Sequence, residues 1–245
     1  MKILTLNTWQ ERGPWRERWE VTFEGLSRFR PDLVSFQELF NPEWAREVQR
    51  RAGYAQMHFS REVSGLVIYT RYPVLSTGIL QLTPSSLEEY GRYALWAELE
   101  AQGGRLFVFN THLSWQREDG PTRERQAEDL LDLAGKKAGH GEILLMGDLN
   151  ASPDSPEIKF LTAQDRFHDL FSEKHPEDKG LTWDNRNPYA ASSEHKMPDR
   201  RIDYILARGE GPLLKDLISC DIVLNQPSAQ GVWASDHYGI LAEFK

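Results

Sequence analysis

Apolar residues recur along this chain with two different spacings, and each spacing predicts a different kind of element. Consecutive or alternating apolar residues predict strands over residues 2–7, 33–38, 65–70, 93–100, 105–110, 143–147, 201–206, 217–224 and 238–244. Spacings of three to four residues predict helices over residues 15–30, from residue 42 onward, over 121–137 and over 155–161. Helices and strands are therefore expected to interleave along the chain.

Turn and cap residues mark several of these element ends. Asn41 is the expected N-cap of the helix that begins at Pro42, and Ser155 is expected to cap the helix that begins at Pro156. Gln102-Gly103-Gly104 predicts the turn of a β-hairpin between two of the strands. Residues 167–200 show the weakest periodicity, which predicts functional loops in that region.

The stretch from Glu142 to Asn150 reads E-I-L-L-M-G-D-L-N and predicts a strand that is buried on both faces. If the extended conformation continues past Gly147, Asp148 and Asn150 project in the same direction from the end of this strand. A carboxylate and a carboxamide in that arrangement can hold a water, a metal or a phosphate oxygen. The alternative is a simple turn, because Asp and Asn favour turns.

Composition limits the classes of function. The chain has 245 residues, of which 40% are hydrophobic and 27% charged, and it shows no repeat or linker, so residues 1–245 are expected to form one domain. A formal net charge of -8 argues against a long non-specific nucleic-acid surface, so a polyanionic substrate would need a local grip, such as a metal ion. The single Cys220 excludes an intramolecular disulfide framework and a Cys-rich zinc site. With no signal peptide and no transmembrane segment in the sequence, we expect a cytoplasmic protein without an evident protein partner.

Polar side chains gather where the predicted strands end. They are Asn7, Glu38, Asn110 with His112, Asp148 with Asn150, Asp203, and Asp236 with His237. One such residue alone is ordinarily a turn former, but so many acids, amides and imidazoles at strand ends indicate a shared site. Oxygen ligands suit Mg²⁺ or Mn²⁺ better than zinc, and histidines beside carboxylates transfer protons near neutral pH. The pattern therefore predicts metal-assisted hydrolysis of a phosphate ester.

Six motifs then carry a resemblance to a known family. In order along the chain they are T-L-N-T-W (5–9), F-Q-E (36–38), N-T-H-L (110–113), G-D-L-N (147–150), R-I-D-Y-I-L (201–206) and S-D-H-Y-G-I (235–240). This set resembles the deoxyribonuclease-I-like endonuclease/exonuclease/phosphatase superfamily and spans almost the whole chain. The resemblance implies an α/β (α+β) fold, a four-layer sandwich of two packed mixed β-sheets flanked by helices. It also implies Mg²⁺-dependent attack of water on a phosphoester.

The same resemblance implies roles for the metal and water ligands. Glu38 would be the principal metal ligand, with Asn7 and Asp236 nearby. Asp148 would orient or deprotonate the attacking water, and Asn150 would hold that water or the phosphate.

The remaining implied roles concern the imidazoles and the phosphate. Asp203 would pair with His237 and fix its ring against the scissile phosphate, and His112 would help to protonate the leaving oxygen. Asn110 would bind phosphate. Which imidazole is the acid is not decided by the sequence.

The substrate is less sharply indicated. Thr182-Trp183-Asp184, together with the S-D-H-Y-G motif, is similar to tyrosyl-DNA phosphodiesterases and to neutral sphingomyelinases. Arg92 is a candidate phosphate clamp, with a solvated surface charge as its alternative. Trp183 is a candidate stacking platform for a base or ring, with a core anchor for its loop as the alternative.

Two groups of arginines are candidate contacts for a nucleic-acid backbone. They are Arg12, Arg16 and Arg18, and Arg117, Arg123 and Arg125. Glutamates interleave with both groups, which predicts solvated helix faces of mixed charge instead.

The leading hypothesis is a Mg²⁺-dependent phosphodiesterase that acts on nucleic acid ends or on a small phosphodiester. The alternatives are a phosphomonoesterase acting on a sugar or inositol phosphate, a sphingomyelinase-like phospholipid phosphodiesterase, and a binding module that kept the fold and lost the chemistry. The presence of every expected acid, amide and imidazole argues against the last alternative.

Overall fold

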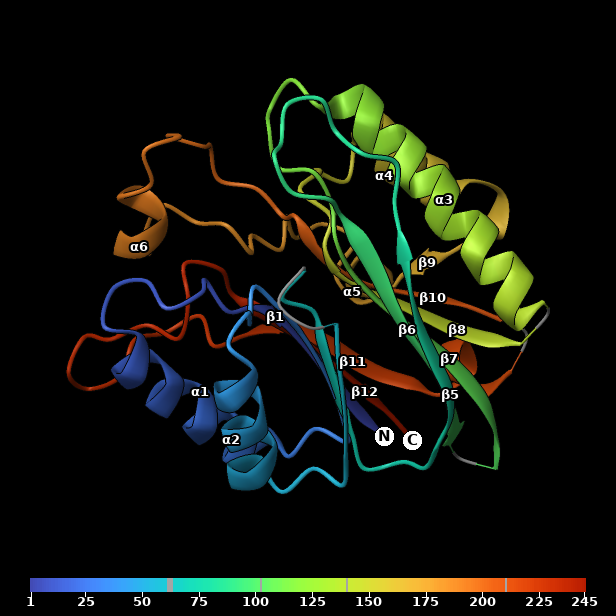
Figure 1. The fold of residues 1–245 in the computed structure, drawn as a ribbon, viewed down its shortest axis with the longest axis horizontal. Helices are drawn as coiled ribbons and strands as arrows, with labels where there is room; N and C mark the ends of the chain where they lie inside the picture. Colours follow the sequence, from blue (N-terminus) through green and yellow to red (C-terminus); the bar gives the residue numbers. More distant parts are fainter. Residues whose placement is uncertain (61–63, 102, 140, 210) are drawn as a thin grey trace.

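The computed structural model describes residues 1–60, 64–101, 103–139, 141–209 and 211–245, and these form two six-stranded sheets (Figure 1). Sheet 1 has the spatial order β11 (Leu217–Val223), β12 (Gly239–Phe244), β1 (Lys2–Asn7), β2 (Leu33–Gln37), β4 (Val67–Thr70) and β3 (Gln56–Phe59). Sheet 2 has the order β5 (Val74–Gln81), β6 (Tyr93–Ala101), β7 (Gly104–His112), β8 (Glu142–Asp148), β10 (Asp203–Arg208) and β9 (His168–Asp169). Both sheets are mixed, because β1–β2 and β7–β8 are parallel pairs among antiparallel ones.

Helices cover the two outer faces. In Figure 1, α1 (Trp15–Phe29) and α2 (Pro42–Ala52) lie on one side of the sandwich, and α3 (Gly120–Ala138) and α4 (Pro156–Thr162) lie on the other. The shorter elements are η1 (Ala163–Asp165), α5 (Leu170–Lys174), α6 (Pro188–Ala191) and α7 (Pro212–Lys215). None of the helices in the described ranges has the length and apolarity that crossing a membrane requires.

The residues of β8 show why four layers form. Leu144 and Met146 join the core cluster between the two sheets, whereas Ile143 and Leu145 join the cluster under α3. Successive side chains of a strand point to opposite faces, so a continuous apolar run is buried on both of them. The predicted strand with two buried faces, and with it the four-layer sandwich of two mixed sheets, is confirmed.

Several predicted element ends are also confirmed. The Asn41 side chain accepts hydrogen bonds from the backbone N–H groups of Glu43 and Trp44, both at 3.0 Å, and caps α2. The β6–β7 hairpin forms with Ala101 opposite Gly104, and Gln102 of its predicted turn lies outside the described residues.

The predicted cap at Ser155 is wrong in its chemistry. Ser155 does precede α4, but its side chain makes no cap hydrogen bond, and its hydroxyl donates to the Ser152 carbonyl oxygen at 2.6 Å. The hydroxyl therefore closes the preceding turn.

Strand β5 was not predicted, because its sequence pattern is weak. It lies at an edge of sheet 2, and Leu75 and Ile79 on it are exposed. Gly78 in its middle faces Trp96, and a Cβ at this glycine would lie 2.7 Å from the indole ring. A strand with an exposed apolar edge and a central glycine lacks the alternation that predicts strands from sequence.

The two sheets are aligned so that their functional strand ends meet at one end of the sandwich. Asn7 at the end of β1 pairs with Gln37 at the end of β2, and His112 at the end of β7 pairs with Asp148 at the end of β8. Asp203, where the antiparallel β10 begins, also pairs with Asp148. Side chains from both sheets therefore reach the same place.

Candidate active site

The first part of the site comes from sheet 1. The Asn7 amide donates to Glu38 Oε1 at 3.4 Å and to Asp148 Oδ2 at 3.0 Å, and the second of these bonds links the two sheets. The Ser235 hydroxyl donates to the Asn7 carbonyl oxygen at 2.6 Å and lies 3.1 Å from Asp236 Oδ1. These contacts link Asn7 to Glu38 through its side chain and to Asp236 through Ser235.

Two site residues adopt a left-handed backbone conformation. Glu38 follows β2 with φ of 59°, and Asn150 follows β8 with φ of 50°. Asn tolerates this region, but for Glu it is unfavourable by roughly 1–3 kcal/mol, and such conformations persist mainly where the surrounding structure holds a functional group in place. The turn at Glu38 directs its carboxylate to the strand ends instead of continuing the strand.

The second part of the site comes from sheet 2 and is centred on Asp148. His112 Nε2 lies 3.4 Å and His237 Nε2 lies 3.7 Å from Asp148 Oδ2. The other oxygen, Oδ1, accepts the backbone N–H of Asn150 at 2.9 Å, and the Asn150 amide donates to the Leu113 carbonyl oxygen at 3.1 Å. One buried carboxylate therefore faces both imidazoles and is fixed by a neighbouring backbone group.

Asp203 and His237 form the predicted pair. His237 Nδ1 lies 2.8 Å from Asp203 Oδ2, with both side chains buried. The Asp203 backbone N–H is itself held by the Thr182 hydroxyl at 3.2 Å. The edge of Trp183 contacts the His237 ring, with ring centroids 5.1 Å apart and an interplanar angle of 80°. The ring of His237 is therefore fixed on two sides, and its Nε2 remains directed at Asp148.

The two imidazoles have opposite electrostatic environments. Burial alone lowers the pKa of His237, but the carboxylates of Asp203 and Asp148 outweigh it and raise that pKa to about 10. At His112, burial and the positive charge of Arg92 outweigh Asp148 and lower the pKa to about 3. At neutral pH His237 is therefore the charged imidazole and His112 the neutral one.

The donor set of sheet 1 fits a divalent cation. Burial and the nearby Glu38 carboxylate raise the pKa of Asp236 to about 7, because two carboxylates share a site with few hydrogen-bond donors. A cation bound between them would relieve this repulsion, and the third candidate ligand is the Asn7 amide oxygen, which also accepts the Trp9 backbone N–H at 3.1 Å. Asp148, Asp203 and His237 also offer ligand atoms within 4.8 Å of one another. In this second group His237 Nδ1 is already occupied by Asp203.

Asn110 requires a correction. It is fully buried between the sheets, where its amide donates to the carbonyl oxygens of Phe36 and Val67 at 2.9 and 3.0 Å. Its Oδ1 accepts the Gln37 side-chain amide at 2.8 Å. Both donor hydrogens and the acceptor are used, so the predicted phosphate contact is not supported and Asn110 instead links the two sheets.

The side chains of Arg92 and Trp183 lie near the site, but both are engaged by other residues of the protein. Arg92 is close enough to affect His112, but its Nε forms an ion pair with Glu88 at 2.6 Å, so neither a free phosphate clamp nor a solvated charge describes it. Trp183 is 7% exposed and packs with Ala190 and Ile202, which supports the alternative of a core anchor.

Arg18 and Arg123 contradict the prediction of solvated helix faces. Arg18 is 1% exposed, and its guanidinium donates to five backbone carbonyl oxygens, those of Thr8, Trp9, Gln10, Arg12 and Ala234. It thereby ties the loop after Asn7 to the loop before Asp236. Arg123 is buried against Glu157 at 2.6 Å.

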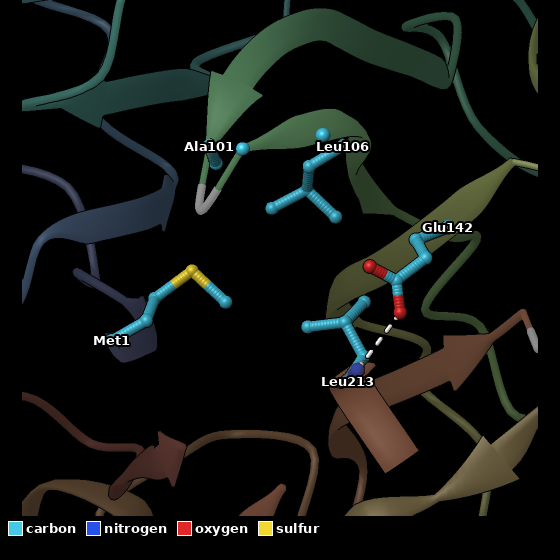
Figure 2. Close-up of a pocket in the computed structure, with 7 residues that line it drawn as sticks. Met1, Ala101, Leu106, Glu142 and Leu213 are labelled. Atoms are coloured by element: carbon cyan, nitrogen blue, oxygen red, sulfur yellow. Dashed lines mark hydrogen bonds between the residues drawn. The ribbon is translucent and has the colours of Figure 1, made fainter. Parts of the chain in front are cut away.

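A separate pocket, shown in Figure 2, lies beside the start of β7. It is lined by Met1, Ala101, Gly103, Gly104, Leu106, Glu142 and Leu213. Its acidic group is already partnered, because Glu142 Oε1 accepts the backbone N–H of Leu213 at 2.8 Å. β7 begins beside this pocket and ends at His112, so the pocket lies about one strand length from the candidate active site.

Comparisons with known proteins identify the family of this chain. A family model described as the Endonuclease/Exonuclease/phosphatase family matches residues 5–237. The chain is 25% identical over 288 residues to the "Putative neutral sphingomyelinase" of Caenorhabditis elegans, with 100% of this chain and 66% of the relative covered. It is also 25% identical to carbon catabolite repressor protein 4 homolog 3 of Arabidopsis thaliana, over 62% of this chain and 36% of the relative.

Solved structures show the same fold. TDP2 from D. rerio, crystallised with a single-strand DNA product, superposes with a TM-score of 0.84 at 19% identity, covering 100% of this chain and 98% of that one. This chain thus spans 66% and 36% of the lengths of its two curated relatives and almost the whole of that solved structure.

Proposed function

This chain belongs to the endonuclease/exonuclease/phosphatase family and is a hydrolase of phosphoester bonds, and we propose that it is a Mg²⁺-dependent phosphodiesterase acting on nucleic acid ends or small phosphodiesters. The observation that carries the proposal is that the candidate metal ligands lie next to Asp148 and its two imidazoles, between the sheets. Glu38 and Asp236 bring two acidic groups to one place, and the Asn7 amide joins Glu38 to the Asp148 carboxylate, which faces both imidazoles.

Glu38, Asp236 and Asn7 are the residues that would hold the ion. When bound, Mg²⁺ supplies Lewis-acid neutralisation of the negative charge that builds on the phosphoryl oxygens. Hard oxygen ligands without cysteine suit this ion, and the like-charged pair of Glu38 and Asp236 gives the site its affinity for a cation.

The rest of the chemistry belongs to the chain itself. Asp148 accepts a proton from the attacking water and orients it, because its Oδ1 is fixed by the Asn150 backbone and its Oδ2 lies between the Asn7 amide and the two imidazoles. His237, with its ring fixed by Asp203, presents Nε2 to a phosphoryl oxygen. His112 lies at 3.4 Å on another side of Asp148 and hydrogen-bonds the leaving oxygen. Asp148 and both imidazoles thus lie within one small volume.

The proposed substrate class is supported by likeness. The fold matches that of TDP2 with a single-strand DNA product over its full length, which favours nucleic acid ends. The match to a relative named as a sphingomyelinase makes a phospholipid phosphodiester the second candidate. We further propose that residues 1–245 work as one domain in the cytoplasm. Support comes from the contribution of both sheets to the site and from a single, buried and unpaired Cys220, which suits a reducing compartment.

Hydrolysis of bis-p-nitrophenyl phosphate with Mg²⁺ tests this proposal. We expect excess EDTA to abolish turnover and Asp148→Asn to lower kcat by about 10²–10⁴-fold, because a positioned base contributes that much. Asp132→Asn on the exposed face of α3 is the matched control. A folded Asp148→Asn variant with wild-type turnover, or turnover that persists in EDTA, would contradict the proposal. A panel of 5′-tyrosyl single-stranded DNA, sphingomyelin and inositol phosphates then separates the substrates.

A further inference from the structure

Arg200 lies on the irregular segment that precedes β10 and is directed to the same face as His237. Its backbone N–H and carbonyl exchange two hydrogen bonds with Trp183, each at 2.9 Å. Trp183 forms a second antiparallel bridge, with His237, on its other side. Residues directly opposite each other in antiparallel pairs project their side chains from the same face. Arg200, Trp183 and His237 therefore share one face, and His237 places that face at the active site.

The guanidinium of Arg200 has no protein partner within the described ranges. Its Nε is buried without a hydrogen bond, and no other atom of the group makes a hydrogen bond or an ion pair with a described residue. The neighbouring arginines are different, because Arg201 pairs with Asp169 at 2.7 Å, Arg123 with Glu157 and Arg92 with Glu88. Arg200 is thus a half-buried cation that makes no hydrogen bond or ion pair with a described residue.

The charges around Arg200 indicate what kind of ligand it can bind. Burial lowers the pKa of Arg200, while Asp148 and Asp203 lie close enough to raise it, and a guanidinium remains charged at neutral pH in either case. Glu38, Asp148, Asp203 and Asp236 make the site acidic, so an entering phosphate meets strong repulsion. A half-buried, unpaired cation that interacts with Asp148 and Asp203 offsets that repulsion.

We propose that Arg200 is a phosphate-binding residue of this active site, whose guanidinium N–H groups bind the non-bridging oxygens of the scissile phosphate beside Asp148 and His237. This inference rests on the proposed phosphoesterase function. A planar guanidinium can bind two phosphate oxygens at once, which orients the phosphorus as well as attracting it. Arg200 would then hold the phosphate from the side of Trp183, across from the ligands of sheet 1.

The test compares Arg200→Met and Arg200→Gln with wild type and with a matched control, Arg105→Met. Arg105 is an exposed arginine near the start of β7, at the far end of the same sheet from His112. One readout is kcat/KM for bis-p-nitrophenyl phosphate with Mg²⁺. The other needs no turnover, and is the increase in Tm that inorganic phosphate produces in each variant in the presence of Mg²⁺.

We expect Arg200→Met to lower kcat/KM by about 10²-fold or more, as the loss of one preorganised donor to a developing charge does. We also expect it to abolish the phosphate-induced increase in Tm. Arg200→Lys should recover part of both effects, and Arg105→Met should behave as wild type.

Wild-type kcat/KM and a wild-type phosphate effect in either folded neutral variant would overturn the proposal. Arg200→Gln, which keeps a polar stem, serves if Arg200→Met does not fold. If wild type hydrolyses no phosphodiester, the proposed function fails. In that case, loss of the phosphate effect in Arg200→Gln, with its retention in Arg105→Met, would still support Arg200 as the phosphate-binding residue.

Discussion

Replacement of Asn110 separates a structural role from a catalytic one. Asn110→Ala removes the two buried hydrogen bonds that the Asn110 amide donates to the carbonyl oxygens of Phe36 and Val67. Each such hydrogen bond contributes about 0.5–1.5 kcal/mol, so we expect the free energy of unfolding to fall by roughly 1–3 kcal/mol. The lost contact with Gln37 adds little to this decrease, because the Gln37 amide keeps longer contacts with Thr5 and Ser35. For a chain of this size the loss lowers Tm by ~5 °C.

The assay is urea unfolding followed by fluorescence, with kcat/KM measured at a temperature at which the variant is folded. Asn225→Ala is the control, because the Asn225 side chain has no hydrogen-bond partner among residues that the structure describes, and its stability should stay at the wild-type value. We expect the folded fraction of Asn110→Ala to retain kcat/KM within about tenfold of wild type, since Asn110 is sealed from substrate. Unchanged stability with a loss of kcat/KM beyond 10²-fold would refute this reasoning and restore the phosphate role.

Three further predictions follow from the site and the core. Asp203→Asn should lower kcat by about 10²–10⁴-fold with little change in far-ultraviolet circular dichroism, because His237 loses the carboxylate that fixes its ring; wild-type kcat would contradict that role. Arg18→Met should reduce the free energy of unfolding by ~3 kcal/mol or more, measured in urea, since five backbone carbonyl oxygens lose their donor; an unchanged midpoint would show that water replaces it. Burial raises the pKa of the Cys220 thiol, so the thiol stays protonated, and native protein should not react with Ellman's reagent at pH 8 until denaturant is added; rapid labelling of native protein would contradict the burial.

Most of the site could be predicted from sequence, because strand ends are visible in the apolar pattern. Asn7, Glu38 and Asp148 directly end or follow such runs, and parallel neighbours end at the same edge of a sheet. Asn110 was misassigned because it shares a strand face with His112 but lies two residues deeper, under the opposite sheet. The depth of a position beneath a second sheet depends on tertiary packing, which the pattern within one strand does not contain.

The sequence contains a signal for the burial of Arg18, but the interleaved glutamates obscure it. Arg18 lies three residues after Trp15 and four before Thr22, on the stripe of α1 that packs inward. The position of Arg18 on that stripe predicts its burial better than its charge does. A buried guanidinium is tolerated here because backbone carbonyl oxygens of the folded loops accept its hydrogen bonds, and the sequence does not show those loops. Arg200 carries no such periodic signal, since its orientation arises from a bridge to Trp183, 17 positions earlier. The predicted fold class needed none of these details.

The assembly of the site across two sheets has a consequence for how the protein can be monitored. Sheet 2 is built from the continuous segment 74–208, and sheet 1 from the segments on either side of it. The bonds from Asn7 to Asp148 and from His237 to Asp203 each cross between the sheets. An intermediate with both sheets formed but displaced relative to each other would keep its circular dichroism spectrum and yet be inactive. Phosphoester turnover therefore reports whether the two sheets are packed in their native arrangement.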